Sequence, residues 1–140
     1  MMFLAFIDSM PANERPALLV THTGVQETCS SKRNLTDKQL MRIVEVQKDA
    51  LIGIGFFEFA VCGNRVDDIV AAIRHVADLV GVRHVALGSD WDGFVTVPID
   101  AENLAKLTHR LRTSGFPPDS IERIMGLNTV EFLESALPPN

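Results

Sequence analysis

The sequence predicts an α/β fold built on a small parallel sheet. Three short apolar runs, at residues 17–22, 51–57 and 82–87, are typical of strands that are buried on both faces beneath helices. Segments whose apolar residues recur at helical spacing separate these runs. Because strands that alternate with helices pair in parallel through right-handed crossovers, we expect one three-stranded sheet. Nothing marks an internal boundary, so residues 1–140 are predicted to form a single domain.

The first third of the chain supplies the first strand and the first complete helix. Residues 1–10 are predicted to be the last turns of a helix that Pro11 ends, and a loop at 12–16 precedes the strand. Thr36 and Gln39 form a capping box, in which the two side chains satisfy free amides at the start of a helix. The buried face of that helix consists of Leu40, Ile43 and Val44.

The middle of the chain contains the second strand and the clearest helix. Gly53 and Gly55 lie inside the second apolar run, and glycine within a strand indicates that a ligand or a neighbouring side chain approaches the backbone closely. The next helix is predicted from Asp67 to Gly81, because glycine is a natural stop. Its apolar stripe consists of Ile69, Ile73, Val76 and Val80.

The last third of the chain is predicted to add the third strand, a polar loop and three helices. The loop GSDWDG, residues 88–93, follows the strand. A helix at 100–112 directs Leu104, Leu107 and Leu111 inward, and a second helix begins at Pro118. Asn128, with Glu131 three residues later, is predicted to cap the third helix. Three histidines are assigned no chemistry: His75 at a boundary, His84 packed within the strand, and His109 in solvent.

Composition excludes several classes of partner. The chain has 140 residues and a formal net charge of −5, which argues against binding to nucleic acid or to an anionic membrane surface. No apolar run approaches the ~20 residues that a membrane-spanning helix needs. The opening MMFLAFID lacks the basic region and cleavage site of a signal peptide. Cys29 and Cys62 permit one disulfide but do not require it; with no export signal, we expect a cytoplasmic location and two reduced thiols.

Polar groups suited to chemistry follow two of the strands. His22 ends the first strand, and a neutral imidazole is a common ligand for a transition metal. Arg33, in the following loop, offers a planar guanidinium that can bind a carboxylate through two parallel hydrogen bonds. Asp90 and Asp92 follow the third strand, and an aspartate beside a metal can act as a general base. The alternatives are a solvated loop around His22 and Arg33, and a simple Asx-type turn for GSDWDG.

Four segments together resemble the membrane (renal) dipeptidase family of zinc peptidases, especially its bacterial members. They are THTGVQETCSSKRNLTDKQL, IGIGFFEFAVCG, DDIVAAIRHVADLVGVRHVALGSDWDG and IERIMGLNTVEFL, in the order and spacing of the family. The resemblance extends from about Pro16 to Leu133. It implies that the chain is the C-terminal part, about strands six to eight with their helices, of a (β/α)8 TIM-type barrel. The family places a two-zinc site at the carboxyl ends of the barrel strands.

The resemblance assigns roles to three residues of this chain. His22 matches a zinc ligand, Arg33 matches the arginine that holds the terminal carboxylate of the dipeptide, and Asp90 matches the acid/base residue. Asp92 and Gly93 complete the motif, with an expected structural role in the loop. Cys29 and Cys62 fall where some secreted relatives form a disulfide, so these residues are expected to lie close together. The family's other metal ligands, on strands one, three and five, have no counterpart here.

Two hypotheses of different classes follow from this partial match. The first is a zinc-dependent dipeptidase that cleaves dipeptides with a free C-terminal carboxylate, with this chain carrying only part of the site. The second is an inactive barrel fragment or assembly module. A third, another amidohydrolase-like barrel, leaves the DWDG and KRNL motifs unexplained. We expect no stoichiometric zinc in this chain alone, and we expect self-association or docking to the missing part of the barrel.

Overall fold

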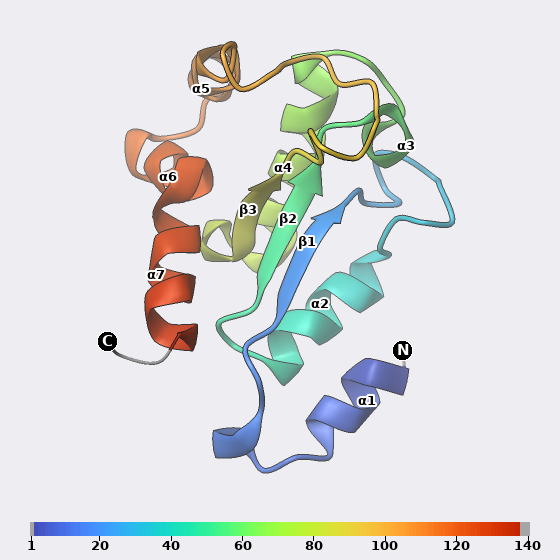
Figure 1. The fold of residues 1–140 in the computed structure, drawn as a ribbon, viewed down its shortest axis with the longest axis vertical. Helices are drawn as coiled ribbons and strands as arrows, with labels where there is room; N and C mark the ends of the chain where they lie inside the picture. Colours follow the sequence, from blue (N-terminus) through green and yellow to red (C-terminus); the bar gives the residue numbers. More distant parts are fainter. Residues whose placement is uncertain (1, 138–140) are drawn as a thin grey trace.

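A computed structural model describes residues 2–137 as a three-stranded sheet surrounded by helices (Figure 1). The helices and strands are α1 (Met2–Asp8), β1 (Leu19–Thr23), α2 (Asp37–Val46), β2 (Leu51–Gly55), α3 (Glu58–Val61), α4 (Val66–Val80), β3 (Val85–Gly88), α5 (Ala105–Thr113), α6 (Pro118–Glu122) and α7 (Asn128–Ala136). In addition, 3₁₀ turns span Ala12–Glu14 and Val82–His84, and a π-helical turn spans Arg123–Leu127.

The three strands are parallel and lie side by side in chain order, as the sequence predicts (Figure 1). The pairing of β2 with β3 is regular, with Ile52 opposite Val85 and Gly55 opposite Gly88. The pairing of β1 with β2 shifts register between Val20 and Thr23. Since the strands are parallel, the residues after β1 and after β3 meet at the same, carboxyl edge of the sheet.

The core lies between the sheet and the helices that follow each strand. Ile52 and Ile54 of β2 are fully buried, as alternate residues on the same face of a strand. The predicted stripe of α4 packs in the same cluster through Ile69, Ile73 and Val76, while α2 contributes Leu40, Ile43 and Val46. A second, small cluster joins Leu51 and Ala86 to Phe132 of α7. These contacts fix β2 as the central strand, buried along its whole length.

The predicted capping box starts α2 where the sequence places it. The Thr36 hydroxyl accepts a hydrogen bond from the Gln39 amide at 3.2 Å, and the Gln39 side chain accepts one from the Thr36 amide at 2.9 Å. His75 of α4 contacts the side chain of Asp37, the first residue of α2, at 2.7 Å. This polar contact joins α2 and α4 in addition to the apolar core that both helices share.

The prediction that the first strand is buried on both faces is wrong. Leu19 is 41% exposed and Thr21 is also exposed, whereas Val20 packs against the core. The alternation arises because the described residues cover only the face that carries Val20 and leave the face of Leu19 and Thr21 open. An apolar run alone does not show whether both faces of a strand are covered.

Three further local predictions are corrected by specific hydrogen bonds. His84 lies in a 3₁₀ turn before β3, where its Nδ1 is 2.9 Å from the Ala50 carbonyl oxygen, and not within the strand. The fifth helix begins at Ala105 instead of residue 100, because the Asp100 side chain accepts the Asn103 amide in a local turn. Asn128 is not an N-cap: its buried side chain donates to the Val82 and Val85 carbonyls at 2.8 Å each.

Within residues 2–137, no helix combines the length and the apolar character that crossing a membrane requires.

Candidate active site

His22 lies at the carboxyl end of β1, within the register shift. Its Nδ1 is 3.1 Å from the Thr21 hydroxyl oxygen, and its side chain is half-buried. Gly88, the last residue of β3, approaches the same backbone: a Cβ at Gly88 would lie 2.9 Å from the His22 Cα and would overlap the Thr21 carbonyl oxygen. The absence of a side chain at Gly88 therefore lets the ends of β1 and β3 come together.

Arg33 lies in the loop after β1 and returns to the end of that strand. Its guanidinium donates to the His22 carbonyl oxygen at 3.4 Å. The guanidinium carbon also lies 4.6 Å from the centre of the Phe57 ring, above its face. The Arg33 side chain is exposed, so its remaining donors are accessible from solvent.

Phe57 is the site residue that the sequence analysis did not single out. It follows β2 and is only 3% exposed. Its ring meets the His22 ring edge to face, with centroids 6.1 Å apart, and it carries Arg33 on its face. The sequence signal that could have identified Phe57 is its position two residues after the end of the central strand. In an α/β barrel, site residues lie at the carboxyl ends of the strands.

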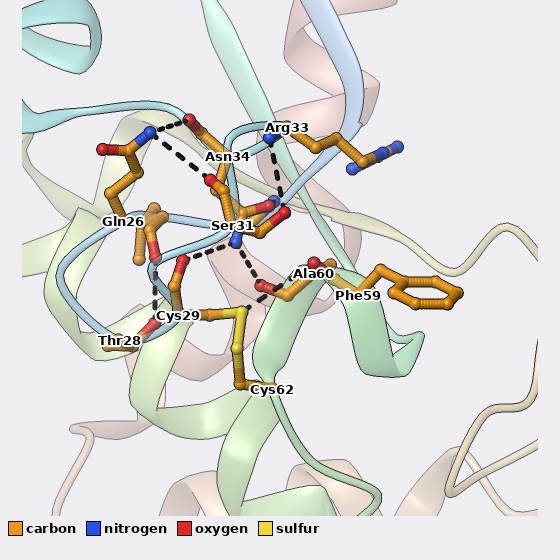
Figure 2. Close-up of a disulfide and its surroundings, with 11 residues drawn as sticks. Gln26, Thr28, Cys29, Ser31, Arg33, Asn34, Phe59, Ala60 and Cys62 are labelled. Atoms are coloured by element: carbon orange, nitrogen blue, oxygen red, sulfur yellow. Dashed lines mark hydrogen bonds between the residues drawn. A yellow bond between two sulfur atoms is a disulfide. The ribbon is translucent and has the colours of Figure 1, made fainter.

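A buried amide and a disulfide fix the loop that carries Arg33 (Figure 2). Asn34 is 2% exposed, accepts a hydrogen bond from the Gly24 amide at 3.2 Å, and donates to the Cys29 and Ala60 carbonyls at 2.9 Å each. Cys29 is bonded to Cys62, which ends α3. Arg33 extends away from the disulfide (Figure 2). The loop after β1 is therefore tied to the segment after β2 at two points, Ala60 and Cys62.

The disulfide confirms one prediction about the thiols and corrects another. The Cα atoms of Cys29 and Cys62 are 5.2 Å apart, within the ~7 Å limit for a bridge, so the predicted proximity is confirmed. The prediction of two reduced thiols is wrong for this structure, in which both cysteines are bonded. The physical reason is local: the Asn34 hydrogen bonds bring the Cys29 turn against α3, which places the two sulfur atoms in contact.

Asp90 follows β3 in a tight turn, with a φ of +57° in the left-handed region. The Gly93 amide donates to the Asp90 carbonyl at 3.0 Å, and the Asp90 carboxylate lies over Gly93, where a Cβ would approach it to 2.5 Å. Trp91 anchors the loop by donating from Nε1 to the Ile99 carbonyl at 2.9 Å. The motif is therefore a turn closed by a backbone hydrogen bond, and its place after β3 puts Asp90 at the same edge of the sheet as His22, while the acid/base role of Asp90 stays a prediction.

The donor groups present do not by themselves fit a two-zinc centre. Among residues 2–137, no three side chains of His, Cys, Asp or Glu lie close enough together to hold a metal ion. His22 offers one imidazole, whereas a catalytic zinc takes about three protein ligands. The cysteine sulfurs are bonded to one another and so are not thiolate ligands.

Sequence comparison relates the chain to dipeptidases. The sequence model of membrane dipeptidase, peptidase family M19, matches residues 5–137. An uncharacterized protein in the pqqA 5′ region of Klebsiella pneumoniae is 32% identical over 128 residues, which cover 84% of this chain and 46% of that protein. Dipeptidase ataJ of Aspergillus terreus is 28% identical over 137 residues, covering 91% of this chain and 32% of that protein. The chain thus spans less than half the length of these relatives.

Comparison of structures gives the same relationship. A crystal structure of a family M19 metallopeptidase, the dipeptidase AC, superposes with a TM-score of 0.81 at 24% identity, covering 95% of this chain and 40% of that one. A metallopeptidase from Rhodobacter sphaeroides, liganded with a phosphinate mimic of the dipeptide L-Ala-D-Ala, gives a TM-score of 0.78 at 27% identity, covering 90% of this chain and 38% of that one. The three-stranded sheet and its helices are therefore part of a (β/α)8 barrel. The chain belongs to the membrane dipeptidase family, M19.

Proposed function

We propose that this chain carries part of the active site of a zinc-dependent dipeptidase, with His22, Arg33 and Asp90 as its functional residues. The observation that supports this most strongly is the hydrogen bond from the Arg33 guanidinium to the His22 carbonyl, at the sheet edge that Asp90 also follows. Family membership supplies the reaction class. The substrate is a dipeptide with a free C-terminal carboxylate.

Arg33 holds the C-terminal carboxylate of the dipeptide. Its guanidinium is exposed, and its contacts with the His22 carbonyl and the Phe57 ring leave other N–H donors directed at solvent. A planar guanidinium and a carboxylate form two parallel charge-assisted hydrogen bonds. A fixed carboxylate anchor beside the reacting groups limits the substrate length, because a longer peptide places its carboxylate farther from the scissile bond.

Asp90 moves the proton during hydrolysis. As a carboxylate it accepts a proton from the attacking water, and as a carboxylic acid it delivers that proton to the amine nitrogen of the leaving amino acid. The turn closed by the Gly93 amide and anchored by Trp91 holds the aspartate in place. His22 would supply one zinc ligand, and no group of three His, Cys, Asp or Glu side chains that could hold a metal ion occurs among residues 2–137.

The remaining barrel is the partner that the proposal requires. The chain covers 40% and 38% of the two solved metallopeptidases, so their barrels contain strands that have no match here. We propose that a segment carrying such strands docks along β1 and β3 and brings the other zinc ligands.

The cytoplasmic location predicted from the sequence is also a proposal. It is tested by measuring how many of the two cysteines of the protein are free thiols in cells.

Reconstitution of the barrel tests the proposed function. The 140-residue chain is purified alone and after co-expression with the complementary barrel strands of an M19 relative, and hydrolysis of L-Ala-D-Ala and bound zinc are measured. We expect turnover and about two zinc ions per site, as in binuclear metallopeptidases, only in the combined protein. Asp90→Asn should abolish turnover while zinc stays bound, and Asp92→Asn serves as the neighbouring carboxylate control. Turnover that survives in Asp90→Asn contradicts the proposal.

A second candidate function is that of an inert fragment or assembly module. Large apolar side chains support it: Leu19 on β1, Phe59 on α3 and Phe94 after β3 are exposed. Exposed apolar surface of this kind promotes association independently of any catalysis. A combined protein that binds zinc stoichiometrically and yet leaves every dipeptide intact favours this second candidate.

A further inference from the structure

The Phe57 ring occupies a fixed position between three groups of the site. Gly55 lies against it: a Cβ at Gly55 would be only 2.7 Å from the Phe57 Cε1 atom and 3.1 Å from Cζ. The His22 ring meets it edge to face at 6.1 Å, with an interplanar angle of 73°. The Arg33 guanidinium carbon lies over the ring face, 4.6 Å from the ring centre.

The backbone around Phe57 holds the ring in this place. The Phe57 carbonyl accepts the Ala60 amide at 2.9 Å, so the residue caps the short helix α3. Ala60 in turn accepts the Asn34 side chain, next to Arg33 in sequence. The ring and the arginine that lies on it are thus positioned by two segments that are joined to each other.

We infer that Phe57 is the positioning residue for Arg33: its ring face holds the guanidinium in the orientation that receives the carboxylate of the substrate. This inference rests on the proposed function of Arg33. A long, exposed arginine has many rotamers, and fixing it only on binding costs conformational entropy. A guanidinium stacked on an aromatic face retains its in-plane N–H donors. Stacking therefore fixes the orientation of the guanidinium and leaves those donors free to bind a carboxylate.

The alternative is that Phe57 only fills space at the end of β2. The ring is 3% exposed, so an aliphatic residue of similar size would also fill that space. The two roles differ in what an aliphatic replacement does. Leucine retains apolar burial but has no π face, so it removes the contact with Arg33 and leaves most of the packing.

Order at Arg33 gives the first test, and it needs no catalysis. In the 140-residue chain, the ¹⁵N heteronuclear NOE of the Arg33 Nε reports how freely the guanidinium moves. We expect Phe57→Leu to make this group mobile and Phe57→Tyr to retain its order. If Phe57→Leu fails to fold, Gly55→Ala replaces it, because the added methyl displaces the ring while leaving it aromatic, with the same expected loss of order. An Arg33 group equally ordered in Phe57→Leu or in Gly55→Ala overturns the inference.

Phe116 provides a matched control elsewhere in the chain. It is 5% exposed, and the Arg74 guanidinium carbon lies 3.4 Å from its ring centre. Phe116→Leu removes an equally buried ring and the same kind of stacking contact. We expect it to loosen Arg74 and to leave Arg33 unchanged. Loosening of Arg33 in this control as well would assign the effect to general loss of stability and would overturn the inference.

Kinetics of the reconstituted dipeptidase give the second test. A cation–π contact at an accessible site is worth enough to raise KM for L-Ala-D-Ala roughly 2- to 5-fold in Phe57→Leu, with kcat nearly unchanged. Phe57→Tyr should restore KM. A mobile Arg33 with an unchanged KM means that Arg33 does not hold the carboxylate, which overturns the proposed role of Arg33 and not its positioning by Phe57. A lowered kcat at constant KM in Phe57→Leu overturns the inference that Phe57 acts on substrate binding through Arg33.

Discussion

At the scale of single residues, the geometry of Arg33 distinguishes it from an ordinary surface charge. It is exposed, yet its guanidinium contacts a backbone carbonyl and an aromatic ring at the end of the strand that carries His22. An arginine on a solvated loop, the alternative that the sequence left open, would have neither contact. The identity of the side chain therefore matters more here than its charge.

Replacing Arg33 by lysine tests this distinction. Lysine keeps the positive charge but cannot form two parallel hydrogen bonds, and one lost charge-assisted bond is worth ~1.5–3 kcal/mol. In the reconstituted dipeptidase, we expect Arg33→Lys to raise KM for L-Ala-D-Ala by roughly 10- to 150-fold. Arg112→Lys, on the exposed face of α5, is the control and should leave KM unchanged. A wild-type KM in Arg33→Lys would show that Arg33 does not bind the substrate.

Gly88 offers a test of the contact between the ends of β1 and β3. A methyl group at this position would overlap the Thr21 carbonyl oxygen and lie 2.9 Å from the His22 Cα, and both are backbone atoms that cannot rotate away. We expect Gly88→Ala to lower the free energy of unfolding by ~1–3 kcal/mol, as overpacking does. Urea unfolding followed by circular dichroism measures the change. An unfolding midpoint equal to that of the wild type would show that the two strand ends do not touch in solution.

At the scale of elements, patterns with a local physical cause were predictable. The Thr36 capping box starts α2 because both of its hydrogen bonds join residues three apart. The apolar stripe of α4 is buried because its spacing matches the helix. The glycines of β2 were expected to admit a close neighbour, and the Phe57 ring and the Thr21 carbonyl lie against Gly55 and Gly53 respectively.

Features that depend on distant partners were not predictable. Asn128 looks like a helix cap in sequence, but its side chain donates to carbonyls more than 40 residues away. The stack of Arg33 on Phe57 joins two loops whose separation in space no local pattern encodes. The exposed face of β1 depends on which segments cover it, and the sequence of the strand does not contain that information.

The tie between the loop after β1 and α3 leads to a prediction about stability. Cys29 and Cys62 are 33 residues apart, and the chain-entropy model gives ~3–4 kcal/mol for closing a loop of this length. The Asn34 hydrogen bonds remain after reduction, so we expect the reduced chain to fold with its stability lowered by up to that amount. Urea unfolding with and without dithiothreitol measures the difference.

The control for this prediction is the double variant Cys29→Ala, Cys62→Ala. Because it has no disulfide to reduce, dithiothreitol should not change its unfolding curve. An unfolded double variant would contradict the expectation that the disulfide is not required for folding.

At the scale of the whole molecule, the described sheet has two outer strands, and β1 exposes an apolar residue. Leu19 is 41% exposed and lines an apolar groove of about 290 Å³, together with Leu4 of α1, Ile43 of α2 and Leu35 of the loop before α2. An edge strand with an apolar surface favours pairing with another chain. We therefore expect the purified chain to self-associate.

Leu19→Lys should reduce this association, because a charge on an edge strand opposes pairing. Analytical ultracentrifugation over a range of chain concentrations measures the effect. Met41→Lys is the matched control, since Met41 is 47% exposed on α2 and is not a strand residue. A wild-type chain that sediments as a monomer at all concentrations would contradict the prediction.

The order of the strands also has a consequence for the kinetics of folding. Each strand pairs with the next strand in the chain, β1 with β2 and β2 with β3, so each pairing in the described sheet spans a single crossover and none skips over a strand. Contacts that are close in sequence form faster than distant ones, because less loop entropy is lost. During synthesis the sheet can therefore grow one strand at a time as the chain leaves the ribosome, with an open edge available at every stage.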